Sequence, residues 1–128
     1  MEVVDYYLYT KEHEWVSIED NIATIGITDY AQEALGDITF VELPEVGAEV
    51  EQFEEFAAIE SVKAANDIFA PVSGKVIEVN TRLESDPGLI NKSAFEKGWI
   101  AKVQMSDKEE ASNLMTAEEY QKFLESID

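Results

Sequence analysis

Short runs of alternating apolar and polar residues dominate the chain up to Met105, which is the pattern of half-buried β-strands. Two such runs, 15–18 and 22–27, are separated by three polar residues, and this spacing predicts a β-hairpin. Further strands are expected at 37–43, 56–62, 68–70, 75–80 and 99–105. Many short strands with few helices favour a mainly β fold, either a β-sandwich or a flattened β-barrel.

Two segments between the strands have helical or turn character. Residues 28–36 predict a short helix, with Thr28 or Asp29 as the N-cap and Gly36 as the residue that ends it. Residues 86–91 contain an Asp-Pro-Gly sequence and predict a brief helical or turn segment. Both segments are too short to change the mainly β assignment.

The C-terminal part of the chain has a different period. Residues 116–119 form the pattern of a capping box, in which Thr and Glu side chains satisfy the first backbone groups of a helix. Apolar residues then recur at helical spacing, at Tyr120, Phe123, Leu124 and Ile127. We expect a C-terminal helix that packs on the sheet through this stripe.

Length and composition set the limits of the fold. The 128 residues, 45% of them hydrophobic, suffice for one domain over residues 1–128. The chain has no cysteine, which excludes disulfides, thiolate metal sites and a cysteine nucleophile. No apolar run approaches the ~20 residues that span a bilayer, and the N-terminus lacks the basic region of a secretory signal. We therefore expect a soluble protein without a targeting segment.

The charge is strongly one-sided, with 28 acidic and 9 basic residues and a formal net charge of -19. Nucleic acid and anionic membranes are poor partners for such a surface, because binding phosphates requires clustered Lys and Arg. Basic patches on partner proteins suit it better, although plain solubility is the simpler interpretation. Between Lys11 and Lys75 the only Lys or Arg is Lys63, whereas the same stretch holds fifteen Asp and Glu.

Lys63 lies between two predicted strands, where a hairpin turn is required. A lysine at this tip is expected to project away from the sheet, and its small neighbours Ser61, Ala64 and Ala65 leave the amine accessible. A lone lysine in an acidic field keeps its proton, so activation as a catalytic amine is not indicated. An exposed, fixed attachment point is what a covalent carrier with a mobile tether requires.

A series of motifs extends along nearly the whole chain. The segment around the lysine reads Glu60, Ser61, Val62, Lys63 and Ala64. Others are the segments 9–16, 26–32, 35–37, 40–44, 70–74, 78–80, 89–91 and 98–99. Their content and order resemble the glycine cleavage system H proteins, in which the lysine motif is the lipoylation site.

The resemblance implies a lipoyl-domain-like hybrid fold and a non-catalytic, monomeric carrier with lipoate bound covalently to Lys63. In that family the arm takes an aminomethyl group from the pyridoxal-phosphate glycine decarboxylase to the tetrahydrofolate-dependent aminomethyltransferase. Dihydrolipoamide dehydrogenase, an FAD enzyme, then reoxidises it, and a separate enzyme attaches the lipoate. The implied location is cytoplasmic in a bacterium or archaeon and the mitochondrial matrix for a mature eukaryotic form.

In the family the loaded arm can lie in a surface cleft. By its place in the His-Glu-Trp motif, Glu14 is the candidate for a cleft residue that pairs with the amine cargo; the alternative is a solvated acid at a strand end. Two departures from the family leave the attachment site unchanged but bear on partner affinity, and the first also predicts the loss of one contact to the arm. Ala34 stands where some relatives carry a polar or basic residue, and 53–55 replace a turn in which Lys and Gly are frequent.

Two residues invite a catalytic interpretation. His13 is the only histidine and could act as a general base, but no serine or cysteine motif accompanies it, so a structural role is favoured. Ser61 and Lys63 imitate a serine-lysine hydrolase pair, but nothing in the sequence indicates an oxyanion hole.

Three functional hypotheses remain open at this point. The first is the glycine cleavage carrier. The second is another carrier, either a lipoyl or biotinyl domain of a different complex or a relay in lipoate assembly. Biotin is disfavoured, because biotin sites typically read Met-Lys-Met and the residues beside Lys63 are Val62 and Ala64. The third is an unmodified acidic interaction module.

Overall fold

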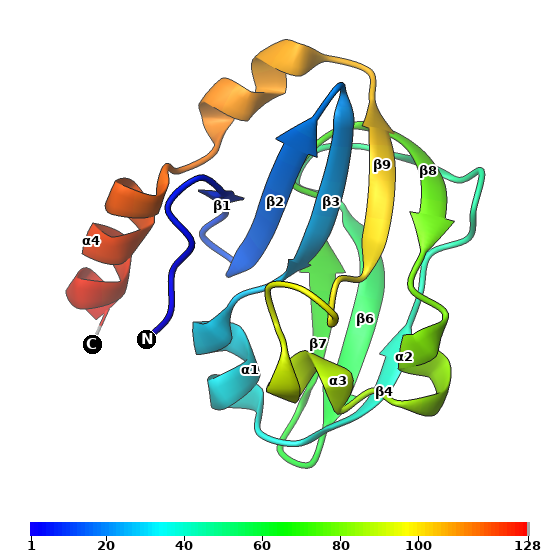
Figure 1. Ribbon diagram of the computed structural model, residues 1–128, viewed down its shortest axis with the longest axis vertical. Helices are drawn as coiled ribbons and strands as arrows, with labels where there is room; N and C mark the ends of the chain where they lie inside the picture. Colours follow the sequence, from blue (N-terminus) through cyan, green and yellow to red (C-terminus); the bar gives the residue numbers. More distant parts are fainter. Residues whose placement is uncertain (128) are drawn as a thin grey trace.

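The computed structural model describes residues 1–127, which form two antiparallel β-sheets with short helices at one end and along one side (Figure 1). The six-stranded sheet has, in spatial order, β1 (Leu8–Tyr9), β2 (Glu14–Glu19), β3 (Ile22–Ile27), β9 (Ala101–Met105), β8 (Gly74–Val79) and β5 (Glu49–Val50). The three-stranded sheet has the order β4 (Ile38–Glu42), β6 (Glu55–Ser61) and β7 (Ala65–Phe69).

The helices are short except for the last one. They are α1 (Asp29–Leu35), α2 (Arg82–Ser85), α3 (Leu89–Lys92), the 3-10 helix η1 (Lys108–Asn113) and α4 (Ala117–Ile127). No helix formed by residues 1–127 has the length and apolarity needed to cross a lipid bilayer.

The two sheets share one core. Ile27 and Ala101 from the large sheet belong to the same buried cluster as Val41, Ile59 and Ile68 from the small sheet. The inward residues of the alternating strands therefore meet between the sheets, as in a sandwich. The prediction of a mainly β sandwich with short helices and a C-terminal helix is confirmed.

The alternative of a closed, flattened barrel is wrong. The ladders of the two sheets remain separate, so β7 at the edge of the small sheet is not paired with a strand of the large sheet. Where β7 approaches β2, the backbone N–H of Phe69 donates instead to the side chain of Glu14, over 3.0 Å. A side-chain carboxyl thus occupies the place that a neighbouring strand would take in a barrel.

Local sequence signals account for most of the predicted elements. The β2–β3 hairpin pairs Glu14 with Ile27 and Glu19 with Ile22, and its turn residues Asp20 and Asn21 have positive φ angles of 50° and 67°. Asn and Asp tolerate this conformation better than other residues with a side chain. The predicted hairpin is confirmed.

The predicted helix boundaries are also confirmed. Thr28, not Asp29, caps α1, because its hydroxyl accepts the N–H of Ala31 over 3.2 Å, and Gly36 ends the helix at φ 77°. At α4 the capping box is reciprocal: Glu119 N–H donates to the Thr116 hydroxyl, and the Glu119 carboxylate accepts the Thr116 N–H.

The apolar stripe of α4 packs largely as predicted. Tyr120 and Leu124 are buried, and the Tyr120 ring stacks on Tyr9 of β1 with a centroid separation of 4.5 Å. Ile127 is the exception, because 44% of it is exposed at the end of the helix.

Candidate functional site

The β6–β7 hairpin ends in a tight tip made by residues 62–64, and Ser61 organises it. The Ser61 hydroxyl accepts the N–H groups of Lys63 (3.2 Å) and Ala64 (3.1 Å) and donates to the carbonyl of Ala64. The Ser61 N–H donates to the same carbonyl over 2.8 Å. Because these bonds fix the backbone on both sides of Lys63, the lysine stands on a rigid turn.

A second set of contacts ties the tip to the corner between α1 and β4. The N–H of Val62 donates to the carbonyl of Asp37 over 3.0 Å. Asn91 of α3 stabilises this corner. Its side-chain NH2 group donates to the Gly36 carbonyl, and its side-chain oxygen accepts a hydrogen bond from the Ile38 N–H, each over 2.9 Å. The hairpin that carries the lysine is therefore attached to the body of the protein through more than its own strands.

Lys63 is exposed, as expected from its place at the tip. Its stem does not point straight outward, however. A Cβ atom placed on Gly36 would lie 3.4 Å from Lys63 Cε, so the side chain leans across the end of α1. Of the other residues in the motif, Glu60, Val62 and Ala64 are also exposed, which leaves the lysine approachable from the side of the small sheet.

Glu14 lies elsewhere, at the start of β2, and only 2% of it is exposed. One carboxylate oxygen accepts a short hydrogen bond from the Thr10 hydroxyl, and the other accepts the backbone N–H of Phe69 over 3.0 Å. The alternative of a solvated acid at a strand end is wrong, because the turn through residues 10–13 folds the carboxyl inward against β7. Alternation alone could not reveal this contact, whose partners are 55 positions apart.

Burial raises the pKa of Glu14 to about 7, and the nearby charge of Glu12 acts in the same direction. The hydrogen bonds from Thr10 and Phe69 oppose this effect without cancelling it. Lys11 lines the cavity that Glu14 faces, but no ion pair joins it to Glu14 among residues 1–127. A buried carboxyl of this kind is stabilised in its ionised form by any cation that can reach it.

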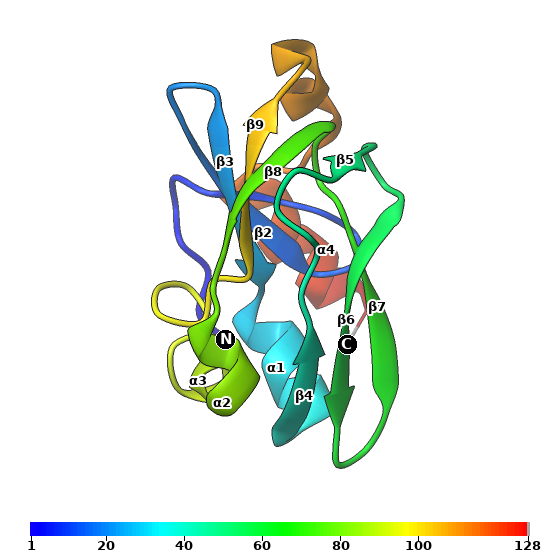
Figure 2. The same cartoon turned by 90° about the vertical axis from the view of Figure 1, so that its right-hand side faces the viewer.

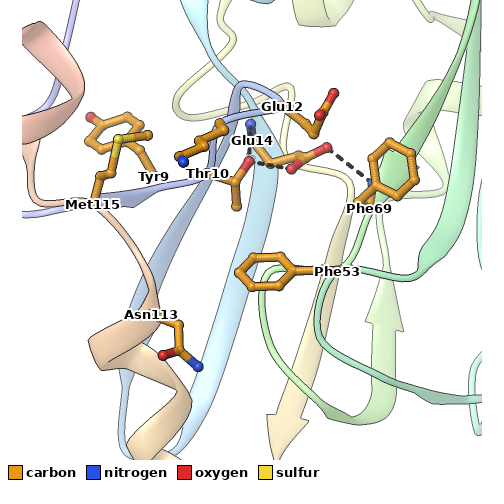
Figure 3. A pocket seen from close by; sticks show the side chains of 9 residues that line it. Tyr9, Thr10, Glu12, Glu14, Phe53, Phe69, Asn113 and Met115 are labelled. Carbon is orange, nitrogen blue, oxygen red and sulfur yellow. Dashed lines mark hydrogen bonds between the residues drawn. The ribbon is translucent and has the colours of Figure 1, made fainter. Parts of the chain in front are cut away.

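Glu14 faces a cavity of about 400 Å³ between β1, β2 and β7 (Figure 3). Tyr9, Phe53, Phe69 and Met115 provide most of the apolar lining, and Glu14 and Thr10 provide polar groups on one wall. The volume lies within the usual range for small-molecule sites. The cavity combines an apolar space with two carboxyls, those of Glu12 and Glu14, and with Lys11. The excess of acidic over basic groups suits a ligand with an apolar body and a basic end.

The β6–β7 turn that carries Lys63 lies at one end of β7, an edge strand of the small sheet (Figure 2). Phe69, which lines the cavity, is the last residue at the other end of this strand. From Ala65 to Phe69 the strand covers four intervals of about 3.3 Å, or roughly 13 Å. Ala65, Asn66 and Asp67 are exposed along this edge. The exposed edge of β7 thus connects the tip that carries Lys63 with Phe69, whose backbone N–H bonds to Glu14.

The geometry weighs against the catalytic interpretations. The Ser61 hydroxyl is engaged in the turn, as described above. His13 belongs to an aromatic group, where its Nδ1 lies 2.8 Å from the Tyr120 hydroxyl and its ring stacks on Tyr30; burial lowers its pKa. Ala34 is exposed on α1 and contributes no polar side chain. Among residues 1–127 no group of three His, Cys, Asp or Glu side chains is placed to hold a metal ion.

Thr10, Phe53, Phe69 and Asn91 are site residues that the sequence did not single out. Thr10 and Asn91 fall inside motifs that resemble those of the H proteins, which was a usable signal. Phe53 was noted only as part of the departure at residues 53–55, and nothing marked Phe69, because their place in the cavity follows from the approach of separate elements.

Comparisons with known proteins agree with this geometry. A sequence model of the family described as glycine cleavage H-protein matches residues 7–127. Among curated relatives, the Arabidopsis thaliana "Glycine cleavage system H protein 2, mitochondrial" is 56% identical over 120 residues, which cover 94% of this chain and 77% of that protein. The Thermotoga maritima glycine cleavage system H protein is 56% identical over 115 residues, covering 90% and 93% of the two chains.

A solved structure extends the likeness to three dimensions. The crystal structure of a glycine cleavage system H protein from Mycobacterium marinum superposes with a TM-score of 0.86 at 38% identity. The match covers 94% of this chain and 98% of that chain.

Proposed function

Because this chain belongs to the glycine cleavage H-protein family, the lipoyl carriers of the glycine cleavage system, we propose that Lys63 carries the lipoyl group as an amide on its Nζ. The observation that carries this proposal is the setting of the lysine: it is exposed at the apex of a rigid hairpin and is the only Lys or Arg between Lys11 and Lys75. Its small and accessible neighbours leave room for a modifying enzyme.

The dimensions of the site fit a lipoyl arm. About twelve bonds separate the lysine Cα from the ring sulfur of such an arm, and at 3.80 Å per three bonds this is roughly 15 Å when extended. That length is comparable to the roughly 13 Å that β7 covers between the tip and the cavity. When bound, the lipoyl group supplies the sulfur atoms that accept the aminomethyl group.

We propose that Glu14 pairs with the amine cargo at the end of the arm. Its carboxyl is buried, faces the cavity and forms no ion pair among residues 1–127. An ammonium group beside it favours the ionised form of Glu14 and gains a charge-assisted hydrogen bond. The apolar part of the lining reduces the contact of the pair with water, which slows hydrolysis of the labile aminomethyl group.

The proposed partners are those of the glycine cleavage system. The carrier receives the aminomethyl group from glycine decarboxylase, delivers it to aminomethyltransferase and is reoxidised by dihydrolipoamide dehydrogenase. It contributes no catalytic group of its own, in keeping with the engaged hydroxyl of Ser61 and the packed ring of His13. A net charge of -19 favours fast and reversible docking to basic partner surfaces, which suits a protein that visits several enzymes.

The attachment is tested by a tryptic mass map, because an acylated lysine resists trypsin. An uncut peptide of residues 12–75 with the added mass of a lipoyl group is the expected result. An octanoyl group alone indicates a relay in lipoate assembly. Cleavage after Lys63, in protein from a host with active glycine cleavage and available lipoate, contradicts the carrier and favours an unmodified interaction module.

The function is tested by Lys63→Arg, which keeps the charge but removes the acylation site. We expect glycine-bicarbonate exchange with glycine decarboxylase to be abolished while the fold is retained. Lys75→Arg, at an exposed lysine of β8, is the matched control and is expected to leave exchange intact. Undiminished exchange with Lys63→Arg contradicts the proposal.

A further inference from the structure

Phe53 has a backbone conformation that is unusual for a large side chain. Its φ is +68°, in the left-handed region where glycine is at ease and a bulky residue is strained. Three backbone hydrogen bonds hold the turn: Phe53 N–H to the Ala70 carbonyl, Glu54 N–H to the Glu51 carbonyl, and Ala70 N–H to the Glu54 carbonyl. The turn requires the positive φ, but nothing in these bonds requires a phenyl ring.

The packing of the ring does not explain its presence either. Phe53 is 51% exposed and belongs to none of the buried core clusters of residues 1–127. A residue that accepts strain in the backbone and leaves half of its surface in water contributes little to folding. Strained residues of this kind gather where a ligand is held.

The position of the ring points to such a role. Phe53 and Phe69 line the same cavity, and Figure 3 shows the Phe53 ring across the cavity from the Glu14 carboxyl. The turn that carries Phe53 also adjoins the end of β7, because its N–H bonds to Ala70, the residue after that strand. The ring therefore forms an apolar wall where a group that follows β7 from Lys63 would arrive.

We propose that Phe53 is a specificity-determining residue that holds the apolar, sulfur-containing end of the arm against Phe69 while Glu14 holds the amine. This inference rests on the proposed function of Lys63 and Glu14. Sulfur beside an aromatic ring makes favourable contacts, and burial of the arm's hydrocarbon adds to them. Glu14 alone selects a basic group, whereas Phe53 makes the cavity select a basic group on an apolar stem.

The experiment compares Phe53→Gly with Phe53→Leu in the lipoylated chain, loaded with its amine cargo and then separated from the partner enzymes. The rate at which ammonia is lost to water reports how well the cavity retains the cargo. We expect Phe53→Gly to speed this loss roughly two- to tenfold, the range of a sulfur–aromatic contact. Phe53→Leu is expected to restore part of the retention through its apolar bulk. Val46→Ala, at an exposed apolar residue outside the cavity lining, is expected to have no effect.

A second readout uses the unmodified chain, because glycine relieves the strain at positive φ. We expect Phe53→Gly to leave the free energy of unfolding unchanged or higher, so that a loss of retention cannot be attributed to a damaged fold. A lowered free energy of unfolding would show that the ring is structural and would overturn the proposal.

Glu14→Gln in the same assay separates the two proposals. If Glu14→Gln speeds ammonia loss and Phe53→Gly does not, the assignment of Phe53 is overturned and the role of Glu14 stands. If neither variant changes the rate, the cavity is not where the cargo is held, and both assignments are overturned.

Discussion

The free energy of unfolding should depend on pH in part through Glu14, and the variant Glu14→Gln should remove this contribution. Glutamine has nearly the same shape: its amide oxygen can still accept the Phe69 N–H, and its NH2 group can donate to the Thr10 hydroxyl oxygen. It cannot be ionised. The variant therefore isolates the effect of burying a titratable carboxyl in the gap between the two sheets.

The sign and size of the effect follow from the pKa. Burial raises the pKa of Glu14 from 4.5 in the unfolded chain to about 7 in the folded protein. Between these values the folded protein keeps the proton and the unfolded chain releases it, so the free energy of unfolding decreases as pH rises. A pKa difference of about 2.5, at 1.36 kcal/mol for each pH unit, corresponds to about 3 kcal/mol. This stabilisation is complete below pH 4.5 and is lost by about pH 7.

Urea denaturation of both proteins at several pH values between 4.5 and 8 measures this effect. Other carboxyls are common to both proteins, among them Glu54 and Glu55, whose pKa values are raised by neighbouring acids. Their contributions cancel in the difference between wild type and variant. We expect the wild type to lose about 3 kcal/mol more than Glu14→Gln as pH rises. Parallel curves for the two proteins would refute the argument from burial.

Three further outcomes follow from the structure. Gly26→Ala should lower the free energy of unfolding by about 2 kcal/mol or more, because the new Cβ would lie 2.6 Å from the buried Trp15 ring; an unchanged urea midpoint would show that the indole can move aside. Ser61→Ala should slow acylation of Lys63 by the lipoate-attaching enzyme while changing the unfolding free energy by only about 1 kcal/mol, and equal acylation rates would contradict a role for the turn. Raising ionic strength from about 0.01 to 0.15 M, which shortens the Debye length from about 30 to 8 Å, should raise the apparent KM of glycine decarboxylase for the lipoylated protein; a flat salt profile would count against electrostatic docking.

Elements with a strong local pattern could be predicted from the sequence. The β2–β3 hairpin follows from alternation on both sides of a polar turn, and α4 follows from its capping box and apolar stripe. The strand after Lys63 was expected to begin at residue 68, but β7 begins at Ala65, because three exposed residues there pair with β6 without an apolar pattern. The hairpin tip is tighter than expected for this reason.

Other elements gave no usable signal. The strands β1 and β5 have two residues each, which is too short for any period, and the 3-10 helix η1 is almost entirely polar. The position of Lys63 at a hairpin tip could be predicted, because a turn between two strands depends on residues that are close in sequence. The burial of Glu14 depends on the approach of β7 to β2, which is a property of the assembled sheets.

The separation of the strands into two sheets also bears on self-association. Separate sheets expose four strand edges, and an exposed edge can pair with the same edge of another copy and seed aggregates. Here β1 and β5 are very short, and Met115 forms a bridge to Tyr9 of β1. On β7, Glu14 occupies the N–H of Phe69, and Asp67 adds charge to the exposed part of the edge. The carboxyl proposed to receive the cargo would also block β7 from pairing with another molecule.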